Sequence, residues 1–461
     1  MGAVVSADRY DLVVIGGGSA GLTAAAFAAQ VGASVLIATE RLGGDCTWTG
    51  CIPSKALIRV ARQAHDGRSV DFATVMAEVH AAIERVYSYE TADALEKLGI
   101  EVSTGPVRFL DGESVQAGNR RVRADHFIVC TGAAPFVPPI PGLEGTRHLT
   151  YETVFDLDLL PESLIVVGAG ATGVELGQAF ARLGSRVTLI DQASSVLPDA
   201  DPEACALIQH RLVVDGIDVR LSAEVNRVAS EAGRVLVAAG SLELQAEALL
   251  LATGRKPRTV GLELDRAGID IRDAAITVDM HLRTSNPRVF AAGDVTGGFQ
   301  FTHYAGWQGY VAARNALLPG GQDGIKANIP WAVFSDPEVA QAGLSEAGAR
   351  SQFDDVLIHR LQLERVDRAQ TEDERDGFLK LVTRAGGKVL GAVVVSRAAG
   401  ETINELALAI ERGLSVSDLA STIHAYPTFG FGVQQLAAQA TFEAAASGIR
   451  GKALRALRRL S

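Results

Sequence analysis

Two closely spaced cysteines, Cys46 and Cys51, are the residues of this sequence best suited to carry chemistry. In a regular helix, residues five apart are separated by about 7.5 Å along the axis alone, which is too far for a disulfide. Gly50 and Pro53 predict the irregular backbone that a disulfide needs. A disulfide that closes so short a loop adds little stability. The pair therefore indicates thiol–disulfide redox chemistry.

The chemical setting of these cysteines supports a redox role. A position near a helix start with Lys55 close by favours a low pKa at one cysteine. A metal site would need two more ligands, and no His or Cys lies at suitable spacing nearby; inert thiols are a further alternative. Cys130 and Cys205 are predicted to be apolar filler. Four cysteines in 461 residues predict a reducing, cytoplasmic location. The missing ligands near the pair predict no metal site.

Two glycine-rich turns predict nucleotide binding. They follow apolar runs at residues 10–15 and 164–167, and each precedes a stretch with helical spacing. The first glycine permits the turn, the second lets backbone approach a pyrophosphate, and the third lets helix pack on strand. Glycine turns without a ligand are the alternative. The predicted cofactor-binding glycines are Gly16, Gly18 and Gly21 in the first turn, and Gly168, Gly170 and Gly173 in the second.

Each glycine turn is followed later by an apolar strand that ends in Thr-Gly, at Thr131-Gly132 and Thr253-Gly254. This repetition favours two nucleotide-binding units over a chance match. It adds Thr131, Gly132 and Gly254 to the predicted cofactor-binding residues.

The length of the chain, 461 residues, predicts about three domains. We predict an α/β fold with two Rossmann-like dinucleotide-binding domains and an additional α+β domain. In the α+β domain, strands at 377–382 and 389–395 precede helices that begin at Glu401 and Val433. The predicted boundaries are 1–148 and 275–325 for the first nucleotide-binding domain, 149–274 for the second and 326–461 for the α+β domain.

Charge and hydropathy argue against two classes of partner. The formal net charge of −11 opposes nucleic-acid binding, which depends on basic side chains that neutralise phosphates. No segment reaches the roughly 20 apolar residues of a membrane span, and we identify no signal peptide. Residues 1–6 fit a loose myristoylation pattern, and the basic segment 450–459 could touch a membrane. A short leader and a solvated helix are the commoner explanations.

Four segments resemble class I pyridine nucleotide–disulfide oxidoreductases, and the resemblance covers nearly the whole chain. They are residues 43–55, the paired glycine turns, Gly293-Asp294 and Tyr426-Pro427-Thr428. The resemblance implies FAD in the first nucleotide-binding domain, NAD in the second, and a dimerisation role for the α+β domain. It also implies an enzyme in which Cys51 lies against the flavin as the charge-transfer thiol while Cys46 exchanges with the substrate.

The same resemblance implies roles for further residues. Lys55 pairs with Glu175 beside the flavin, and Gly44 contributes to cofactor binding. Gly293 and Asp294 bind the ribityl or phosphate side of FAD. Solvated helix charges are the alternative for Lys55 and Glu175, and a turn residue is the alternative for Asp294. The implied assembly is a homodimer in which each subunit completes the active site of the other, with a small molecule as electron acceptor.

An acidic residue at the end of the second strand of each nucleotide-binding unit is expected to bind ribose. Glu40 is the candidate in the FAD unit. Asp191 is the candidate in the NAD unit, where Gln192 follows it instead of an arginine. A carboxylate accepts from the ribose 2′-hydroxyl and repels a 2′-phosphate, so we predict a preference for NADH over NADPH.

The sequence departs from disulfide-reducing members of the family near Tyr426. Those members carry a His–Glu dyad that protonates the leaving thiolate, and this chain has Tyr426 and Phe431 at the two positions. A tyrosine with a pKa of about 10 shuttles protons poorly near neutral pH, although it can donate a hydrogen bond. Tyrosine here is similar to mercuric reductase, but a carboxy-terminal cysteine pair is absent. His424 is the candidate replacement base, with a structural histidine as the alternative.

The predicted function is therefore that of an NADH-dependent flavoenzyme that reduces a disulfide or other soft electrophile at Cys46. Three alternatives stay open: a metal reductase of the mercuric type, a quinone diaphorase in which the cysteines are secondary, and a nucleotide-sensing flavoprotein.

Overall fold

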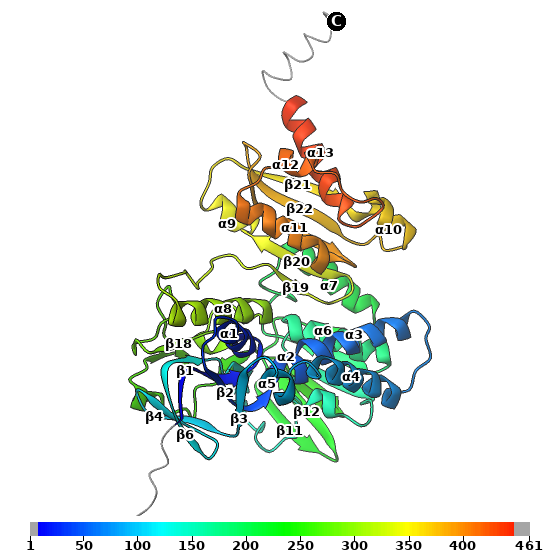
Figure 1. Ribbon diagram of the computed structural model, residues 1–461. Helices are drawn as coiled ribbons and strands as arrows, with labels where there is room; N and C mark the ends of the chain where they lie inside the picture. The colour runs from blue at the N-terminus through cyan, green and yellow to red at the C-terminus, as the bar shows by residue number, and fades with distance from the viewer. Residues whose placement is uncertain (1–7, 447–461) are drawn as a thin grey trace, which may run out of the picture. The chain divides into compact units, whose positions relative to one another are not determined.

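The computed structural model describes residues 8–446, which form two compact units (Figure 1). The first unit contains residues 8–192 and 223–327, and the second contains residues 193–222 and 328–446. The segments 1–6 and 450–459, considered above for membrane contact, lie outside the described residues. Within residues 8–446, no helix combines the length and apolar character needed to cross a membrane.

A seven-stranded sheet forms the first nucleotide-binding fold of unit 1. Its parallel strands are β1 (Asp8–Gly17), β2 (Val35–Leu42), β3 (Ile100–Thr104), β6 (Arg120–Val129) and β18 (Val289–Ala291). The antiparallel strands β4 (Val107–Asp111) and β5 (Ser114–Ala117) extend the sheet beyond β6. The central strand β1 is buried from Leu12 to Ile15, as expected for a parallel strand covered on both faces.

Helices α1 (Ser19–Gln30) and α8 (Thr302–Leu317) lie side by side against this sheet (Figure 1). Their contact surface consists largely of alanines, which let two helices approach closely because their side chains are short. Alanine also favours helix formation more than any other residue. The helix that the sequence predicts after the first glycine turn is therefore α1.

The second nucleotide-binding fold of unit 1 repeats this plan. Strand β8 (Ser163–Val167) pairs in parallel with β9 (Arg186–Ile190) and β14 (Ala248–Leu251), and α6 (Ala171–Leu183) follows the second glycine turn. An antiparallel sheet of β11 (Arg227–Glu231), β12 (Arg234–Ala239) and β13 (Leu242–Ala246) packs its apolar side chains into the same core. Strands β7 (Ala133–Pro135) and β15 (Arg255–Pro257) pair with each other.

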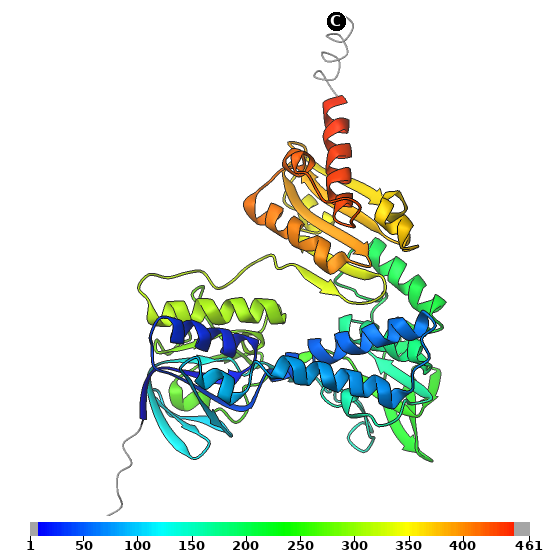
Figure 2. The ribbon, with the colours of Figure 1, turned by 45° about the vertical axis from the view of Figure 1, so that its right-hand side comes forward.

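Between β2 and β3, the chain forms the helices that carry the cysteines. They are α2 (Gly44–Trp48), α3 (Cys51–His65), α4 (Phe72–Tyr87) and α5 (Ala92–Glu96). Figure 2 shows α3 and α4, in blue, side by side. Asp71 caps the start of α4 by accepting a hydrogen bond from the Thr74 amide.

Unit 2 contains a five-stranded antiparallel sheet in the order β19-β20-β23-β22-β21. Its strands are β19 (Trp331–Val333), β20 (Glu338–Gly343), β21 (Val356–Gln362), β22 (Phe378–Arg384) and β23 (Val389–Ser396). Its helices are α7 (Pro202–Val214), α9 (Glu346–Arg350), α10 (Asp367–Thr371), α11 (Ala399–Arg412), α12 (Val416–Ser421) and α13 (Phe431–Ala446). Helices α11 and α13 begin two residues earlier than the predicted Glu401 and Val433. The predicted α/β fold with an added α+β domain is confirmed.

Candidate functional site

The two cysteines are separated by a break between two helices. Helix α2 contains Cys46 and ends at Trp48, and α3 begins at Cys51. Gly50 interrupts the helical backbone, with φ −113° and ψ −115°. A Cβ at Gly50 would lie 2.9 Å from the Asp45 carbonyl oxygen, so this tight turn requires glycine. The irregular backbone expected from the spacing of the cysteines is present, and both cysteines are thiols in this structure.

The electrostatics of the two sulfurs differ. A hydrogen bond from Cys46, the Thr302 hydroxyl at 3.3 Å and the Lys55 ammonium lower the pKa of Cys51 to about 6, although burial opposes this shift. The same hydrogen bond and burial raise the pKa of Cys46. Negative charge therefore resides on Cys51, at the start of a 15-residue helix.

Lys55 and Glu175 form an ion pair that joins α3 to α6, with Nζ 2.8 Å from Oε2. The Glu175 side chain is only 7% exposed and that of Lys55 is 34% exposed. Solvated helix charges, the alternative considered from the sequence, do not describe this pair. Lys55 lies one helical turn after Cys51, so its charge acts on that sulfur.

The two glycine turns have nearly the same geometry. Gly16 and Gly168 have φ +112° and +110°, and a Cβ at either would lie 2.3 Å from a carbonyl oxygen of the neighbouring strand end. A Cβ at Gly21 would lie 2.0 Å from the Gly16 oxygen, and one at Gly173 would lie 1.8 Å from the Gly168 oxygen. Helix and strand thus approach so closely that only glycine fits.

The middle glycine of each turn leaves room for a Cβ. A Cβ at Gly170 would meet nothing within 4 Å, and one at Gly18 would meet only the Gly44 Cα at 3.6 Å. Gly44 has φ +60°, and its own Cβ would lie 2.7 Å from the Gly18 Cα. The cysteine segment therefore packs backbone to backbone against the first glycine turn, and a ligand can approach the start of α1.

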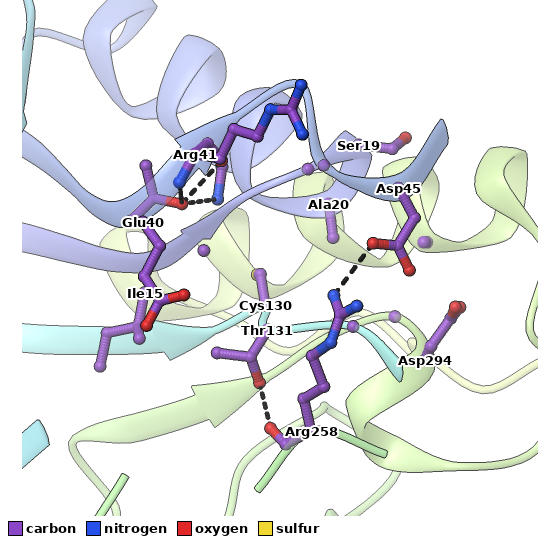
Figure 3. Close-up of a pocket in the computed structure, with 18 of the residues that line it drawn as sticks. Ile15, Ser19, Ala20, Glu40, Arg41, Asp45, Cys130, Thr131, Arg258 and Asp294 are labelled. Carbon is purple, nitrogen blue, oxygen red and sulfur yellow. Dashed lines mark hydrogen bonds and ion pairs between the residues drawn. The ribbon is translucent and has the colours of Figure 1, made fainter. Parts of the chain in front are cut away.

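A cavity of about 680 Å³ lies beside this turn in unit 1 (Figure 3). The predicted site residues that line it are Gly16, Gly18, Glu40, Gly44, Cys46, Thr131, Gly132, Gly293 and Asp294. Backbone amides at the start of α1 offer donors to a diphosphate. Carboxylates at Glu40 and Asp294 offer acceptors for hydroxyl groups. The size, the glycine cradle and this set of polar groups fit an extended dinucleotide such as FAD.

A cluster of charges in the cavity was not predicted from the sequence. Asp45 lies 2.7 Å from an Arg255 nitrogen and 2.9 Å from an Arg258 nitrogen, and Arg255 lies 3.1 Å from Asp294. In Figure 3, a dashed line joins the Asp45 carboxylate to the Arg258 guanidinium. Burial raises the pKa of Asp294. The sequence signals that could have identified this cluster were the positions of Asp45 next to Cys46 and of Arg255 next to Gly254. No sequence motif identified Thr302.

In the second glycine turn, Asp191 directly follows β9 and accepts a hydrogen bond from the Ala169 amide at 2.5 Å. Gly168 donates to the Ile190 carbonyl at 2.9 Å, which brings the end of β9 against the turn. Gly254 has φ +109°, and its carbonyl accepts from Phe136 at 2.9 Å. The predicted residues Gly168, Asp191 and Gly254 therefore lie in loops that follow β8, β9 and β14.

The remaining predicted site residues, His424 and Tyr426, lie in unit 2. His424 is nearly buried, with Nε2 2.7 Å from Glu405 and Nδ1 2.9 Å from the Thr422 carbonyl. Both ring nitrogens face acceptors, which favours a structural role over that of a free base. Tyr426 is 63% exposed and donates to Asp367 at 2.8 Å, and its ring packs edge-on against Phe431. The hydrogen bond to Asp367 raises the pKa of Tyr426.

Residues 8–446 contain no group of three or more His, Cys, Asp or Glu side chains arranged to hold a metal ion. Cys205 lies buried in α7. Cys130 is also buried; it lies just after β6 and borders the cavity.

Two family models and several known proteins match this chain. The family model for pyridine nucleotide-disulphide oxidoreductases matches residues 10–309, and the model for their dimerisation domain matches residues 329–437. The mercuric reductase of Lysinibacillus sphaericus is 34% identical over 413 residues, covering 86% of this chain and 76% of that protein. Dihydrolipoyl dehydrogenase of Bacillus subtilis is 32% identical over 409 residues, covering 83% and 88%.

Among solved structures, the HOCl-induced flavoprotein disulfide reductase RclA from Escherichia coli superposes with a TM-score of 0.87 at 30% identity. The superposition covers 93% of this chain and 99% of RclA. RclA has also been solved as a Cu(II) complex. The resemblance deduced from residues 43–55 and the paired glycine turns is confirmed: this chain belongs to the pyridine nucleotide-disulphide oxidoreductase family of FAD-dependent enzymes that use NAD(P)H.

Proposed function

We propose that this enzyme uses NADH to reduce the Cys46/Cys51 pair, and that Cys46 then transfers electrons to a small, soft electrophile. The observation that carries the proposal is the asymmetry of the two sulfurs. Cys51 is the charged sulfur and begins the helix that bears Lys55. Cys46 is the less acidic thiol. The charged sulfur is thus suited to exchange electrons inside the enzyme, and Cys46 reacts with an acceptor once it has lost its proton.

The residues around the cavity have distinct roles in this proposal. The amides after Gly18 bind the FAD diphosphate, Glu40 binds the adenosine ribose, and Asp294 binds the ribityl side. FAD supplies the two-electron carrier between nicotinamide and the cysteines. Lys55, held by Glu175, stabilises negative charge near Cys51. In the second unit, Asp191 accepts from the ribose of NADH and disfavours a 2′-phosphate.

The acceptor is proposed from the chemistry near Tyr426. A tyrosine that already donates to Asp367 is a poor proton source for a departing thiolate. Acceptors that need no such proton, such as a thiophilic metal ion, therefore suit this enzyme as well as an organic disulfide. The mercuric reductase relatives and the Cu(II) complex of RclA support metal reduction as the second candidate function.

The proposed assembly is a cytoplasmic homodimer in which Tyr426 of one subunit completes the active site of the other. Two observations support the homodimer: the match to the dimerisation-domain model and the exposure of Tyr426 in unit 2. The small number of cysteines in the sequence supports the cytoplasmic location.

Anaerobic titration with NADH tests this function. We expect bleaching of the flavin, followed by long-wavelength thiolate–flavin absorbance, and then reoxidation by a panel of disulfides, mercuric ion, cupric ion and quinones. Cys46→Ser should abolish reoxidation by disulfides and metal ions. Cys205→Ala, which alters a buried cysteine in unit 2, is the matched control and should behave as the parent enzyme. If Cys46→Ser and the Cys205→Ala control both reduced quinones and no other acceptor, the result would contradict the proposal and favour a diaphorase.

A further inference from the structure

Thr302, the first residue of α8, brings a hydroxyl group to the cysteine pair from a segment 251 residues further along the chain. Its Oγ1 lies 3.3 Å from the Cys51 sulfur, and the same hydroxyl also acts on Cys46. A hydroxyl group has one proton, so it can donate to only one sulfur at a time. The sulfur that receives this hydrogen bond is the one on which negative charge is stabilised.

Close packing between α1 and α8 holds Thr302 in place. A Cβ at Gly309 would lie 2.0 Å from the Ala20 carbonyl oxygen, so the two helices touch backbone to backbone. One turn of α8 earlier, a Cβ at Gly306 would lie 2.9 Å from the Ser19 hydroxyl. That hydroxyl donates to the Thr302 carbonyl at 3.0 Å. The Thr302 side chain is therefore positioned by the same helix start that borders the cavity.

Three other groups act on Cys51: the Cys46 thiol, the Lys55 ammonium and the Glu175 carboxylate. Lys55 and Glu175 bind each other at 2.8 Å, and their effects on a nearby thiolate have opposite signs. Thr302 differs from both because it carries no charge and stabilises a thiolate by donation alone. Its contribution is therefore not offset by an oppositely charged neighbour.

We propose that Thr302 is a catalytic residue that donates a hydrogen bond to the Cys51 thiolate of the reduced enzyme, and thereby keeps negative charge on Cys51 and the proton on Cys46. This inference rests on the proposed function, because it concerns the reduced state of the cysteine pair. Thr302 thus favours the reduced state in which Cys51 is the thiolate and Cys46 is the thiol, and Cys46 must lose its proton before it attacks an acceptor.

Two substitutions separate the hydroxyl from the packing of this side chain. Thr302→Val replaces the hydroxyl by a methyl group of similar size, whereas Thr302→Ser keeps the hydroxyl. In the holoenzyme reduced anaerobically with NADH, the thiolate–flavin absorbance is followed as a function of pH. We expect its midpoint in Thr302→Val to move upward by about one pH unit, since one hydrogen bond to a charged group changes an equilibrium about tenfold or more. Thr302→Ser should titrate as the parent enzyme.

Alkylation by iodoacetamide, located by mass spectrometry, gives a second measurement that does not depend on turnover. In Thr302→Val, labelling of Cys46 relative to Cys51 should rise because charge is no longer held on Cys51. Thr302→Ala provides the same comparison with a smaller side chain if the valine variant does not fold.

An unchanged midpoint and labelling ratio in the folded variant would overturn the role of Thr302 and leave the proposed function intact. An equal shift in Thr302→Ser and Thr302→Val would also overturn it, because packing would then be the cause. A parent enzyme that is reduced by NADH and yet develops no long-wavelength absorbance at any pH would contradict the proposed function itself.

Discussion

Replacing Lys55 by methionine tests the ion pair that joins α3 to α6. The substitution keeps an apolar stem and removes the ammonium 2.8 Å from Glu175. Exposed ion pairs contribute about 0.2–1 kcal/mol, whereas removing one partner of a fully buried pair costs about 3–5 kcal/mol. Glu175 is 7% exposed and Lys55 is 34% exposed, so this pair lies between the two limits. We therefore expect Lys55→Met to lower the free energy of unfolding by about 2 kcal/mol.

The difference in exposure also predicts an asymmetry. Glu175→Gln should cost only about 1 kcal/mol, because Lys55 reaches water and can keep its charge hydrated. The double variant should be more stable than Lys55→Met alone, because it no longer leaves a carboxylate in a buried position. Midpoints of urea unfolding, read by tryptophan fluorescence at equal slopes, measure these differences. Lys97→Met at an exposed position is the matched control and should change stability by less than about 0.5 kcal/mol.

The same variants predict opposite effects on the active site. Lys55 lowers the pKa of Cys51 and Glu175 raises it. The pH midpoint of the thiolate–flavin absorbance should therefore move upward in Lys55→Met and downward in Glu175→Gln. Shifts of the same sign, or a double variant less stable than Lys55→Met, would refute the reasoning.

Three further predictions follow from the site. The pKa of Cys51, lowered to about 6 chiefly by the Cys46 hydrogen bond, predicts that thiolate–flavin absorbance is present above about pH 6 and is lost as the pH falls through that value; a spectrophotometric midpoint near the ordinary thiol pKa would contradict it. Replacing Asp191 by Ser together with Gln192 by Arg should raise the ratio of kcat/KM for NADPH to that for NADH by about tenfold or more, because a charge that repels the 2′-phosphate becomes one that attracts it. Steady-state kinetics with both nucleotides measure this ratio. An unchanged ratio would contradict the proposed role of Asp191 in ribose binding. Gly21→Ala would place a Cβ 2.0 Å from a carbonyl oxygen, so the purified protein should lose flavin absorbance. In Gly170→Ala the added Cβ meets nothing within 4 Å, so this variant should keep FAD while the KM for NADH rises. Full flavin content in Gly21→Ala would exclude the proposed cradle.

Local patterns in the sequence predicted the parts of the site that depend on a few consecutive residues. The glycine turns at residues 16–21 and 168–173 contain backbone positions that only glycine satisfies, so the spacing of these glycines in the sequence predicts the geometry of the turns. The break between Cys46 and Cys51 follows from Gly50 in the same way. The ion pair of Lys55 with Glu175 came from the family resemblance, since these residues are 120 positions apart.

Other features depend on segments that meet only in the folded protein. Asp45 lies 210 and 213 positions from its arginine partners, and no local pattern connects them. From the sequence, Tyr426 was predicted to shuttle protons poorly, and His424 was the candidate base with a structural histidine as the alternative. Their hydrogen bonds to Glu405 and Asp367, from α11 and α10, distinguish a histidine held on both nitrogens from an exposed tyrosine.

The sequence alone determined the family and the two nucleotide-binding folds and predicted the redox role of the cysteines, because each rests on backbone geometry or reactive groups within a short stretch of chain. Only the tertiary structure decided the charge on each sulfur, because that charge depends on a hydroxyl from α8, an ammonium on α3 and a carboxylate on α6. Electrostatic effects depend on distance in space, and separation along the chain carries no information about that distance.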